Sequence, residues 1–182
     1  MELGNSNAKL AQFCNSLAMR LDYYNKGSRN KITVQRKENR MIALGCDHGG
    51  YELKQEIIKY LEENKVEYKD YGCYDTASVD YPEYAKKVAH AVADGEAEKG
   101  ILICGTGIGI SIAANKVKGI RAALCHDCFS AQATREHNDA NIVAMGARVI
   151  GAGLAVKIVD TFLNTPFSND ERHIRRIAQI ED

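Results

Sequence analysis

The chain has 182 residues, with 24 Lys and Arg against 24 Asp and Glu, and 45% of its residues are hydrophobic. This composition is typical of a soluble globular protein of one domain, long enough to fold without a disulfide or a bound metal. No apolar run approaches the ~20 residues of a membrane helix, and we recognise no signal peptide, so neither a membrane nor an exported protein is expected. The balanced charge argues against a nucleic-acid partner.

The charge is unevenly distributed. Residues 1–40 carry eight basic and three acidic side chains, which leaves 16 basic and 21 acidic side chains for residues 41–182. We predict a basic N-terminal extension over 1–40, with a short amphipathic helix followed by a polar stretch, and one folded domain over 41–182. The extension is compatible with either an organelle transit peptide or an upstream leader. The helix is indicated by the spacing of Leu10, Phe13, Leu17 and Leu21.

From Met41 onward, short apolar runs alternate with amphipathic stretches. The predicted strands are 41–46, 66–71, 100–104, 120–125 and 141–145. The predicted helices are 51–63, 84–93, 108–117, 129–138, 151–163 and 170–180. Continuously apolar strands separated by helices indicate an α/β fold: an open, doubly wound, five-stranded parallel sheet of Rossmann-like type. Ligands of such sheets bind at the carboxyl ends of the strands.

Two loops at predicted strand ends carry groups suited to chemistry. The segment Gly-Cys-Asp-His-Gly-Gly at 45–50 presents Asp47 and His48 on a glycine turn, although Asp47 is equally suited to capping the next helix. In the segment Cys-Gly-Thr-Gly-Ile-Gly at 104–109, glycines expose backbone N–H groups before a helix, which suits an anion or a developing negative charge.

Cys104 stands at the mouth of this glycine loop, a setting that favours the thiolate and makes it available as a base or nucleophile. The alternative is a small buried apolar residue, which most free cysteines are. His137 lies in a polar turn and is suited to proton transfer, or to a surface or capping role. Arg172 and Arg176 share one helix face and form either a phosphate clamp or a solvated basic face.

Other patterns favour a cofactor only weakly. The glycine loop lacks the third glycine of a dinucleotide fingerprint and the Lys of a P-loop, although Asp127 stands where a ribose-binding acid would. The C-x-x-C of Cys125 and Cys128 has no neighbouring pair of further zinc ligands, and it lies too late in the chain for a thioredoxin-like unit. The six cysteines are therefore expected to be reduced thiols in a reducing compartment.

Five segments in order together resemble the type B ribose-5-phosphate isomerases of the ribose/galactose-6-phosphate isomerase superfamily. They are Gly-Cys-Asp-His-Gly-Gly at 45–50, Asp-Tyr-Pro at 80–82, Ile-Cys-Gly-Thr-Gly-Ile-Gly-Ile-Ser-Ile-Ala-Ala-Asn-Lys at 103–116, Arg-Glu-His-Asn-Asp-Ala-Asn at 135–141 and Arg-His at 172–173. The resemblance begins at Met41, and the extension has no counterpart in it.

The resemblance implies an aldose–ketose isomerase without metal or cofactor, which interconverts ribose 5-phosphate and ribulose 5-phosphate through an enediolate, in the non-oxidative branch of the pentose phosphate pathway. It implies a cytoplasmic homodimer or dimer of dimers whose active sites are shared between subunits. The catalytic residues would be Cys104 as the base that moves the C2 proton to C1, His137 as the acid/base of ring opening, and Thr106. The enediolate would be held by the loop of Gly105, Thr106, Gly107, Ile108 and Gly109, the sugar by Asp47, Tyr81 and Asn138, and the phosphate by His48, Arg148, Arg172 and Arg176.

Two features leave alternatives open. Small glycines commonly precede the late Arg-His in the resembling pattern, whereas this chain places Asp170 and Glu171 beside the clamp, which weakens the case for Arg172 more than for Arg176. Some relatives use a glutamate base six positions after the cysteine, but Ile110 stands there, so we favour the thiolate. Allose-6-phosphate and galactose-6-phosphate isomerases share the pattern, and a non-catalytic sugar-phosphate-binding protein is the alternative of another class.

Overall fold

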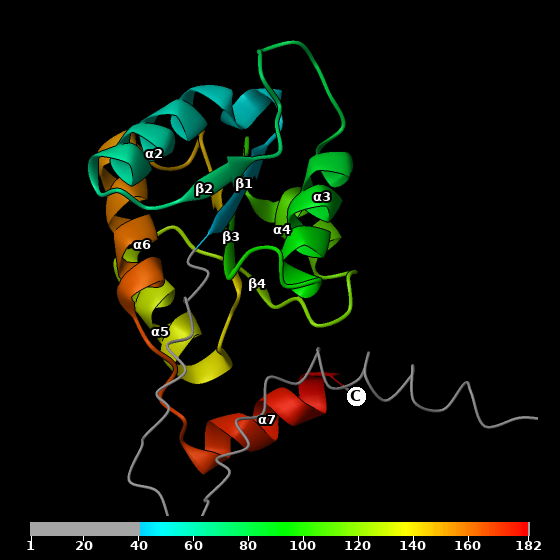
Figure 1. Cartoon of the computed structure of the whole chain (residues 1–182), viewed down its shortest axis with the longest axis vertical. Coiled ribbons are helices and arrows are strands. Elements are labelled where there is room, and N and C mark those ends of the chain that lie inside the picture. The colour runs from blue at the N-terminus through cyan, green and yellow to red at the C-terminus, as the bar shows by residue number, and fades with distance from the viewer. Residues whose placement is uncertain (1–40, 182) are drawn as a thin grey trace, which may run out of the picture. The chain divides into compact units, whose positions relative to one another are not determined.

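The computed structural model describes residues 41–181, so the predicted N-terminal helix and basic stretch lie outside the described residues. Five parallel strands form one sheet in the order β2-β1-β3-β5-β4 (Figure 1). The strands are β1 (Ile42–Cys46), β2 (Tyr68–Asp70), β3 (Lys99–Cys104), β4 (Ala122–Leu124) and β5 (Ile142–Gly146). The predicted doubly wound α/β fold is thus confirmed.

Helices cover both faces of the sheet (Figure 1). The helices are the 3-10 turn η1 (His48–Gly50), α2 (Tyr51–Glu63), α3 (Tyr81–Ala93), α4 (Ile108–Ala114), α5 (Cys128–Asn138), α6 (Ala152–Asn164) and α7 (Glu171–Glu181). One apolar cluster joins the sheet to α2, α5 and α6, and a second joins it to α3 and α4. The all-apolar burial of β1 and β5 follows from this double cover, because neither strand has a face left for water.

The direction of winding reverses between β1 and β3. The chain passes from β1 to the edge strand β2 and then returns to place β3 on the other side of β1. In an open parallel sheet, the loops that follow the two strands at such a reversal diverge and leave room for a ligand. The loop that contains Asp47 follows β1, and the glycine loop follows β3, so this reversal brings the two predicted loops together.

Two helices differ from their predicted bounds for local reasons. Helix α3 begins at Tyr81 rather than Tyr84, because Pro82 is tolerated in a first turn whose N–H groups lack helical partners. Helix α4 ends at Ala114 rather than Val117, because the Asn115 side chain forms two 2.8 Å hydrogen bonds with the backbone of Ala122 and turns the chain toward β4.

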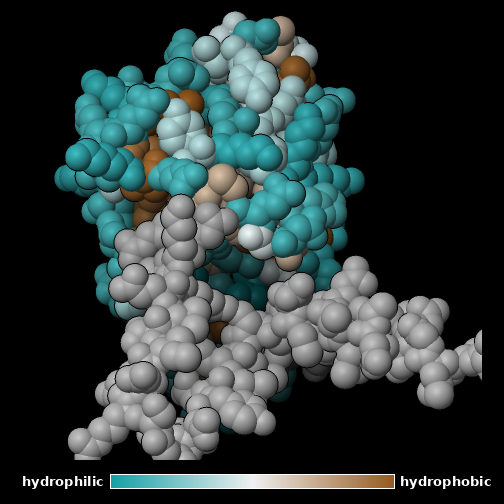
Figure 2. All heavy atoms as spheres, in the orientation of Figure 1, coloured by the Kyte–Doolittle hydropathy of each residue, from teal (hydrophilic) through white to brown (hydrophobic). Residues whose placement is uncertain are grey.

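On the face shown in Figure 2, hydrophilic side chains cover most of the described surface, and hydrophobic atoms show only in small patches. Within residues 41–181, every helix is too short or too polar to cross a membrane.

Candidate active site

Cys104 ends β3 with 4% of its surface exposed, and its thiol faces the glycine loop. The Gly107 N–H donates a hydrogen bond to the Cys104 Sγ at 3.0 Å. A backbone donor aimed at sulfur stabilises the thiolate, because the negative charge on sulfur strengthens the bond. The structure therefore places Cys104 in surroundings that differ from those of a purely apolar cysteine.

Only glycine fits at Gly107. This residue has φ +77°, and a Cβ built on it would lie 2.5 Å from Leu124 Cδ1 and 2.7 Å from the Met145 carbonyl carbon. The left-handed conformation aims the Gly107 N–H back at the Cys104 sulfur, and the close approach packs the loop onto β4 and β5. The thiol contact and the backbone packing thus depend on the same residue.

The loop after β1 meets the loop after β3. Asp47 is 7% exposed, and its Oδ1 accepts the Gly50 N–H at 3.0 Å, so it caps the short turn η1. A Cβ on Gly49 would lie 3.3 Å from both Asp47 Oδ1 and the Gly105 nitrogen. Capping and proximity to the site therefore coexist at Asp47, because the capped turn is what carries its carboxylate beside the glycine loop.

The His48 ring is oriented by the loop before α3. The Val79 N–H donates to His48 Nδ1 at 3.2 Å, which assigns the acceptor role to this nitrogen. In the neutral ring the proton therefore lies on Nε2, which is left as a donor for an anion.

Tyr81 and Arg148 border the glycine loop. A Cβ on Gly109 would lie 2.6 Å from the Tyr81 ring and 2.8 Å from its hydroxyl oxygen, so the phenol lies directly on the start of α4. The Arg148 N–H donates to the Gly105 carbonyl at 3.0 Å, and a Cβ on Gly105 would lie 3.5 Å from Arg148 Nε. Thr106, whose Oγ1 accepts the Ile108 N–H at 3.3 Å, completes the loop. These contacts unite Asp47, Tyr81, Cys104 and Arg148 in one cluster, which we call the thiol cluster.

The predicted acid/base His137 lies at the amino ends of the strands, opposite to Cys104. Helix α5 runs back from the carboxyl end of β4 to the amino end of β5, and its last residues, His137 and Asn138, come only four residues before Ile142 opens β5. Helix α5 has 11 residues and is therefore about 16 Å long. Within one chain, His137 and Cys104 thus lie at opposite ends of the strands, separated by about the length of a strand. Figure 1 shows the end of α5 beside α7, away from the carboxyl edge.

The two arginines of the predicted phosphate clamp lie on α7, the helix beside the end of α5 that carries His137. Arg172 and Arg176 are both exposed on α7, and the Arg172 guanidinium forms an ion pair with Asp170 at 3.4 Å. The carboxylate beside Arg172 therefore occupies that arginine, as the sequence indicated. We call His137, Asn138, Arg172 and Arg176 the histidine cluster.

His173, which the resemblance includes without a role, also lies in this region. Its ring lies 4.6 Å from the His137 ring, centroid to centroid, and its Nδ1 lies 2.8 Å from the Ser168 hydroxyl. His173 is 4% exposed, and desolvation together with the neighbouring Arg172 lowers the pKa of its ring. The signal available in the sequence was the Arg-His pair at 172–173 of the resembling pattern.

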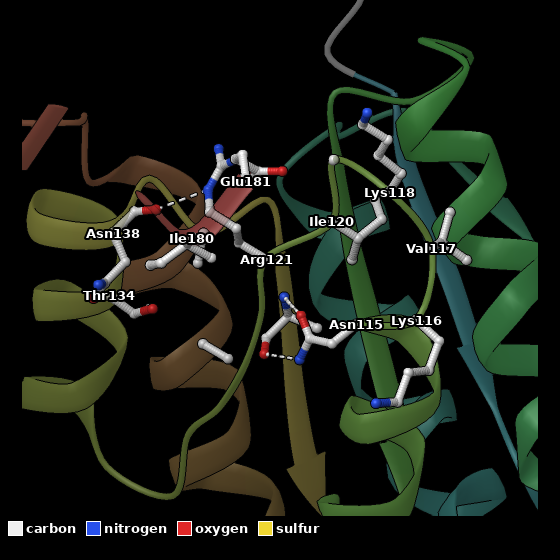
Figure 3. A pocket seen from close by; sticks show the side chains of 14 residues that line it. Asn115, Lys116, Val117, Lys118, Ile120, Arg121, Thr134, Asn138, Ile180 and Glu181 are labelled. Carbon is white, nitrogen blue, oxygen red and sulfur yellow. Dashed lines mark hydrogen bonds and ion pairs between the residues drawn. The ribbon is translucent and has the colours of Figure 1, made fainter. Parts of the chain in front are cut away.

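An open pocket of ≈ 600 Å³ lies between the 115–121 loop, the end of α5 and the end of α7. Arg121 spans it, with a 2.6 Å ion pair to Glu181 and a 2.9 Å hydrogen bond to the Asn138 carbonyl (Figure 3). This pocket lies at the amino edge of the sheet, on the side of the histidine cluster, so it is distinct from the thiol cluster.

The patterns that favoured a cofactor have structural roles. The Asp127 carboxylate caps α5 through the Ser130 N–H at 2.7 Å and the Ser130 hydroxyl at 2.8 Å, and these bonds hold the pKa of Asp127 below its usual range. Cys125 is buried, which raises its pKa to about 11, and Cys128 begins α5. Across residues 41–181, no three His, Cys, Asp or Glu side chains are grouped so that they could hold a metal.

Sequence reasoning also missed a buried cation. Lys54 on α2 has no exposed surface, and its Nζ donates to Asp70 Oδ2 and to the Cys73 carbonyl, both at 2.6 Å. The Cys73 sulfur lies 3.8 Å from the Cys46 sulfur. Neither the lysine nor the pair of thiols stands out in the sequence, because the contact joins segments 16 to 27 residues apart.

Comparison with known proteins identifies the family of this chain. Residues 42–180 match the model of the Ribose/Galactose Isomerase family, and the chain belongs to this family. Ribose-5-phosphate isomerase B of Escherichia coli is 52% identical over 139 residues, which are 76% of this chain and 93% of that protein. The D-erythrulose-4-phosphate isomerase of Pectobacterium atrosepticum is 48% identical over 128 residues, 69% of this chain and 84% of that one. The structure of ribose-5-phosphate isomerase B from Clostridium thermocellum superposes with a TM-score of 0.76 at 53% identity, covering 78% of this chain and 95% of that one.

Proposed function

We propose that this protein interconverts ribose 5-phosphate and ribulose 5-phosphate. The observation that carries the proposal is the thiol cluster: a buried thiol that accepts a backbone N–H, with a carboxylate, a phenol and a guanidinium around one glycine loop. Relatives at about half identity are named for this isomerisation. The same cluster provides a base and a positively charged anchor, the two things that an enediolate reaction on a phosphosugar requires.

In the proposed reaction, the Cys104 thiolate takes the C2 proton of the open-chain aldose, and the electron pair of the C–H bond forms the enediolate. The thiol then returns the proton to C1 while the O2 hydroxyl proton passes to O1, which completes the ketose without any net redox change. The Gly107 N–H already donates to the sulfur and the Ile108 N–H to Thr106, so we assign the enediolate oxygen to the other N–H groups of the 105–109 loop. Asp47 and Tyr81 position the sugar, and His48 Nε2 and Arg148 bind the phosphate.

We further propose that each active site combines the thiol cluster of one copy with the histidine cluster of a second copy. His137 would then open the furanose ring, Asn138 would contact the sugar, and Arg172 and Arg176 would grip the phosphate. Separation of the two clusters by the height of the sheet supports this arrangement, because one chain by itself cannot bring them to one substrate.

Exposed apolar side chains on α4 and at the start of α5, two helices that follow the carboxyl ends of β3 and β4, support a second copy at this edge. Ile108 and Ile112 on α4 are 51% and 54% exposed, and Phe129 at the start of α5 is 80% exposed. Large apolar side chains gathered on an outer surface are typical of an interface. A dimer or a dimer of dimers in the cytoplasm fits these features and the described cysteines, all of which are free thiols in the structure.

A coupled assay of ribose 5-phosphate conversion in EDTA, with and without iodoacetamide, tests the proposal. We expect activity that needs no added metal, is lost on alkylation and is protected by substrate. Absence of turnover would sink the proposal in favour of a sugar-phosphate-binding protein. The same assay with erythrulose 4-phosphate, allose 6-phosphate and galactose 6-phosphate ranks the substrates by kcat/KM, and the relative named for erythrulose 4-phosphate makes the four-carbon sugar the first comparison.

A further inference from the structure

Cys46 and Cys73 form a pair of thiols directly behind the loop that carries Asp47 and His48. Their sulfur atoms lie 3.8 Å apart, although the residues are 27 positions apart in the chain. Their backbones are also paired: the Cys73 N–H donates to the Cys46 carbonyl at 2.8 Å, and the Cys46 N–H donates to the Gly72 carbonyl at 2.7 Å. The backbone separation across such a pairing, roughly 5 Å, lies within the range that a disulfide spans.

We propose that Cys46 and Cys73 are a redox switch: a disulfide between them disturbs the Asp47–His48 loop and weakens sugar-phosphate binding. The consequence for binding rests on the proposed function, whereas the cross-link itself does not. Bonded sulfur atoms lie about 2 Å apart, so forming the disulfide shortens the distance between the two sulfurs by roughly 2 Å. Cys46 takes part of this movement, and it immediately precedes Asp47, so closure acts on the Asp47–His48 loop.

One thiol is reachable and the other lies behind it. Cys73 is 2% exposed, but it begins an irregular segment whose residues 74–78 are all exposed, and its thiol donates to the Asp75 carbonyl at 3.2 Å. Segments with few buried apolar contacts open locally at low cost in free energy. Cys46 has no exposed surface, so Cys73 is the thiol that an oxidant meets first.

The charged neighbour of the pair is Lys54. Its ammonium donates to the Cys73 carbonyl at 2.6 Å and is balanced by Asp70. Burial raises the pKa of the Cys46 thiol, and the Lys54 ammonium opposes that rise. Cys46 is therefore a thiol at rest, while the fixed cation lowers the cost of a transient Cys46 thiolate during exchange.

The oxidant is a low-molecular-weight disulfide. The Cys73 thiolate attacks one of its sulfurs, which forms a mixed disulfide and releases one small thiolate. Cys46 then loses its proton, and its thiolate attacks the Cys73 sulfur, which forms the internal bond and releases the second small thiolate. The protein loses two electrons and two protons, and the small disulfide gains both.

The 73–80 segment links the cross-link to the site. The Val79 N–H of this segment holds His48 Nδ1 at 3.2 Å, and Asp47 Oδ1 holds the Gly50 N–H at 3.0 Å. Formation of the disulfide moves Cys46, which precedes Asp47, and Cys73, which begins the 73–80 segment. We therefore expect both hydrogen bonds to weaken. The Gly50 and Val79 amides thus report the switch without any ligand.

The test uses full-length Cys104→Ser protein, in which bound sugar is not turned over and the active-site thiol cannot react. After treatment with oxidised glutathione, we expect a peptide map that links Cys46 to Cys73, faster hydrogen exchange at Gly50 and Val79, and at least tenfold weaker ribose 5-phosphate binding by calorimetry. Dithiothreitol should restore all three. Adding Cys73→Ser should abolish the response, and adding Cys128→Ser instead should preserve it.

Two results would overturn the switch. The first is that oxidised glutathione forms no cross-link in the folded protein, although both thiols are alkylated once the protein is denatured. The second is a cross-link that leaves the hydrogen exchange of Gly50 and Val79 unchanged. A reduced protein that binds no ribose 5-phosphate would instead refute the proposed substrate. In that case the peptide map and the exchange rates still decide the switch.

Discussion

Cys104 and Cys46 are both buried thiols at the carboxyl ends of neighbouring strands, but their surroundings suit them to different chemistry. The Cys104 sulfur accepts a backbone N–H at 3.0 Å, a contact that stabilises the thiolate. Cys46 faces a second thiol in an interior that raises its pKa. We therefore assign proton transfer to Cys104 and redox exchange to the Cys46–Cys73 pair.

Replacing Cys104 by Ala should remove turnover and leave binding. A general base contributes about 10²- to 10⁴-fold to rate, so kcat is expected to fall by that factor while KM stays within a few-fold. Steady-state kinetics with ribose 5-phosphate measure both constants. Cys125→Ala, which changes another buried thiol, is the matched control and should keep the wild-type kcat. A Cys104→Ala protein with most of its activity would refute the thiolate base.

Gly107 and Gly119 offer a matched pair for testing the glycine loop. Both have positive φ (+77° and +80°), but a Cβ on Gly119 meets nothing within 4 Å, whereas one on Gly107 meets Leu124 and the β5 backbone. Gly119→Ala should therefore cost about 1 kcal/mol of unfolding free energy, from backbone conformation alone. Gly107→Ala should cost at least about 2 kcal/mol more and suppress kcat. Equal losses in urea unfolding would show that the close packing around Gly107 is unimportant.

At the scale of the element, α7 carries the two arginines of the histidine cluster, although it contributes only one buried side chain to the described fold. That side chain is His173, which packs on the His137 ring and lies near Arg172, Arg176 and Asp170. A buried neutral imidazole thus anchors the helix that presents both arginines of the proposed clamp.

This anchor makes stability depend on pH. Desolvation and the neighbouring arginine lower the pKa of His173 in the folded state, so below its ordinary value near 6.5 the unfolded state binds more protons. The contribution of His173 to the free energy of unfolding is therefore fully present above pH 6.5. It is lost progressively as the pH falls below 6.5. The Tm should therefore fall between pH 7.5 and pH 5.5, and His173→Gln should reduce this dependence. His90→Gln, at an exposed position on α3, should leave it unchanged.

At the scale of the whole molecule, the placement of two clusters at opposite edges of the sheet makes a second copy part of the proposed site. Mixing variants tests this directly. Cys104→Ala and His137→Ala should each be impaired alone, because every site then lacks one of the two groups. A mixed dimer of the two carries one intact site, so after random exchange of subunits the activity should recover to about a quarter of the wild-type value.

The control for this experiment is a mixture of Cys104→Ala with wild-type protein, which should retain activity in proportion to the intact sites. If the mixture of the two variants gives only the mean of the two parents, each site lies within one chain and the shared arrangement is wrong.

The amino-acid sequence by itself determined the elements and the loops at the carboxyl edge. Continuously apolar runs identify buried parallel strands, and the glycine loop after β3 identifies the position of Cys104, because both signals are local patterns of a few neighbouring residues. The sequence did not place the start of α3 at Tyr81. Pro82 is the second residue of this helix, and a proline in a sequence usually indicates that no helix is present at that position.

Only the tertiary structure decided which of these residues meet. The reversal between β1 and β3 gathers Asp47, Tyr81, Cys104 and Arg148, and the direction of α5 sends His137 to the far edge. Strand order also brings Cys46 against Cys73 and buries Lys54 beside them. These contacts join segments that are far apart in the chain, so they depend on how the whole sheet is wound, and no local pattern encodes them.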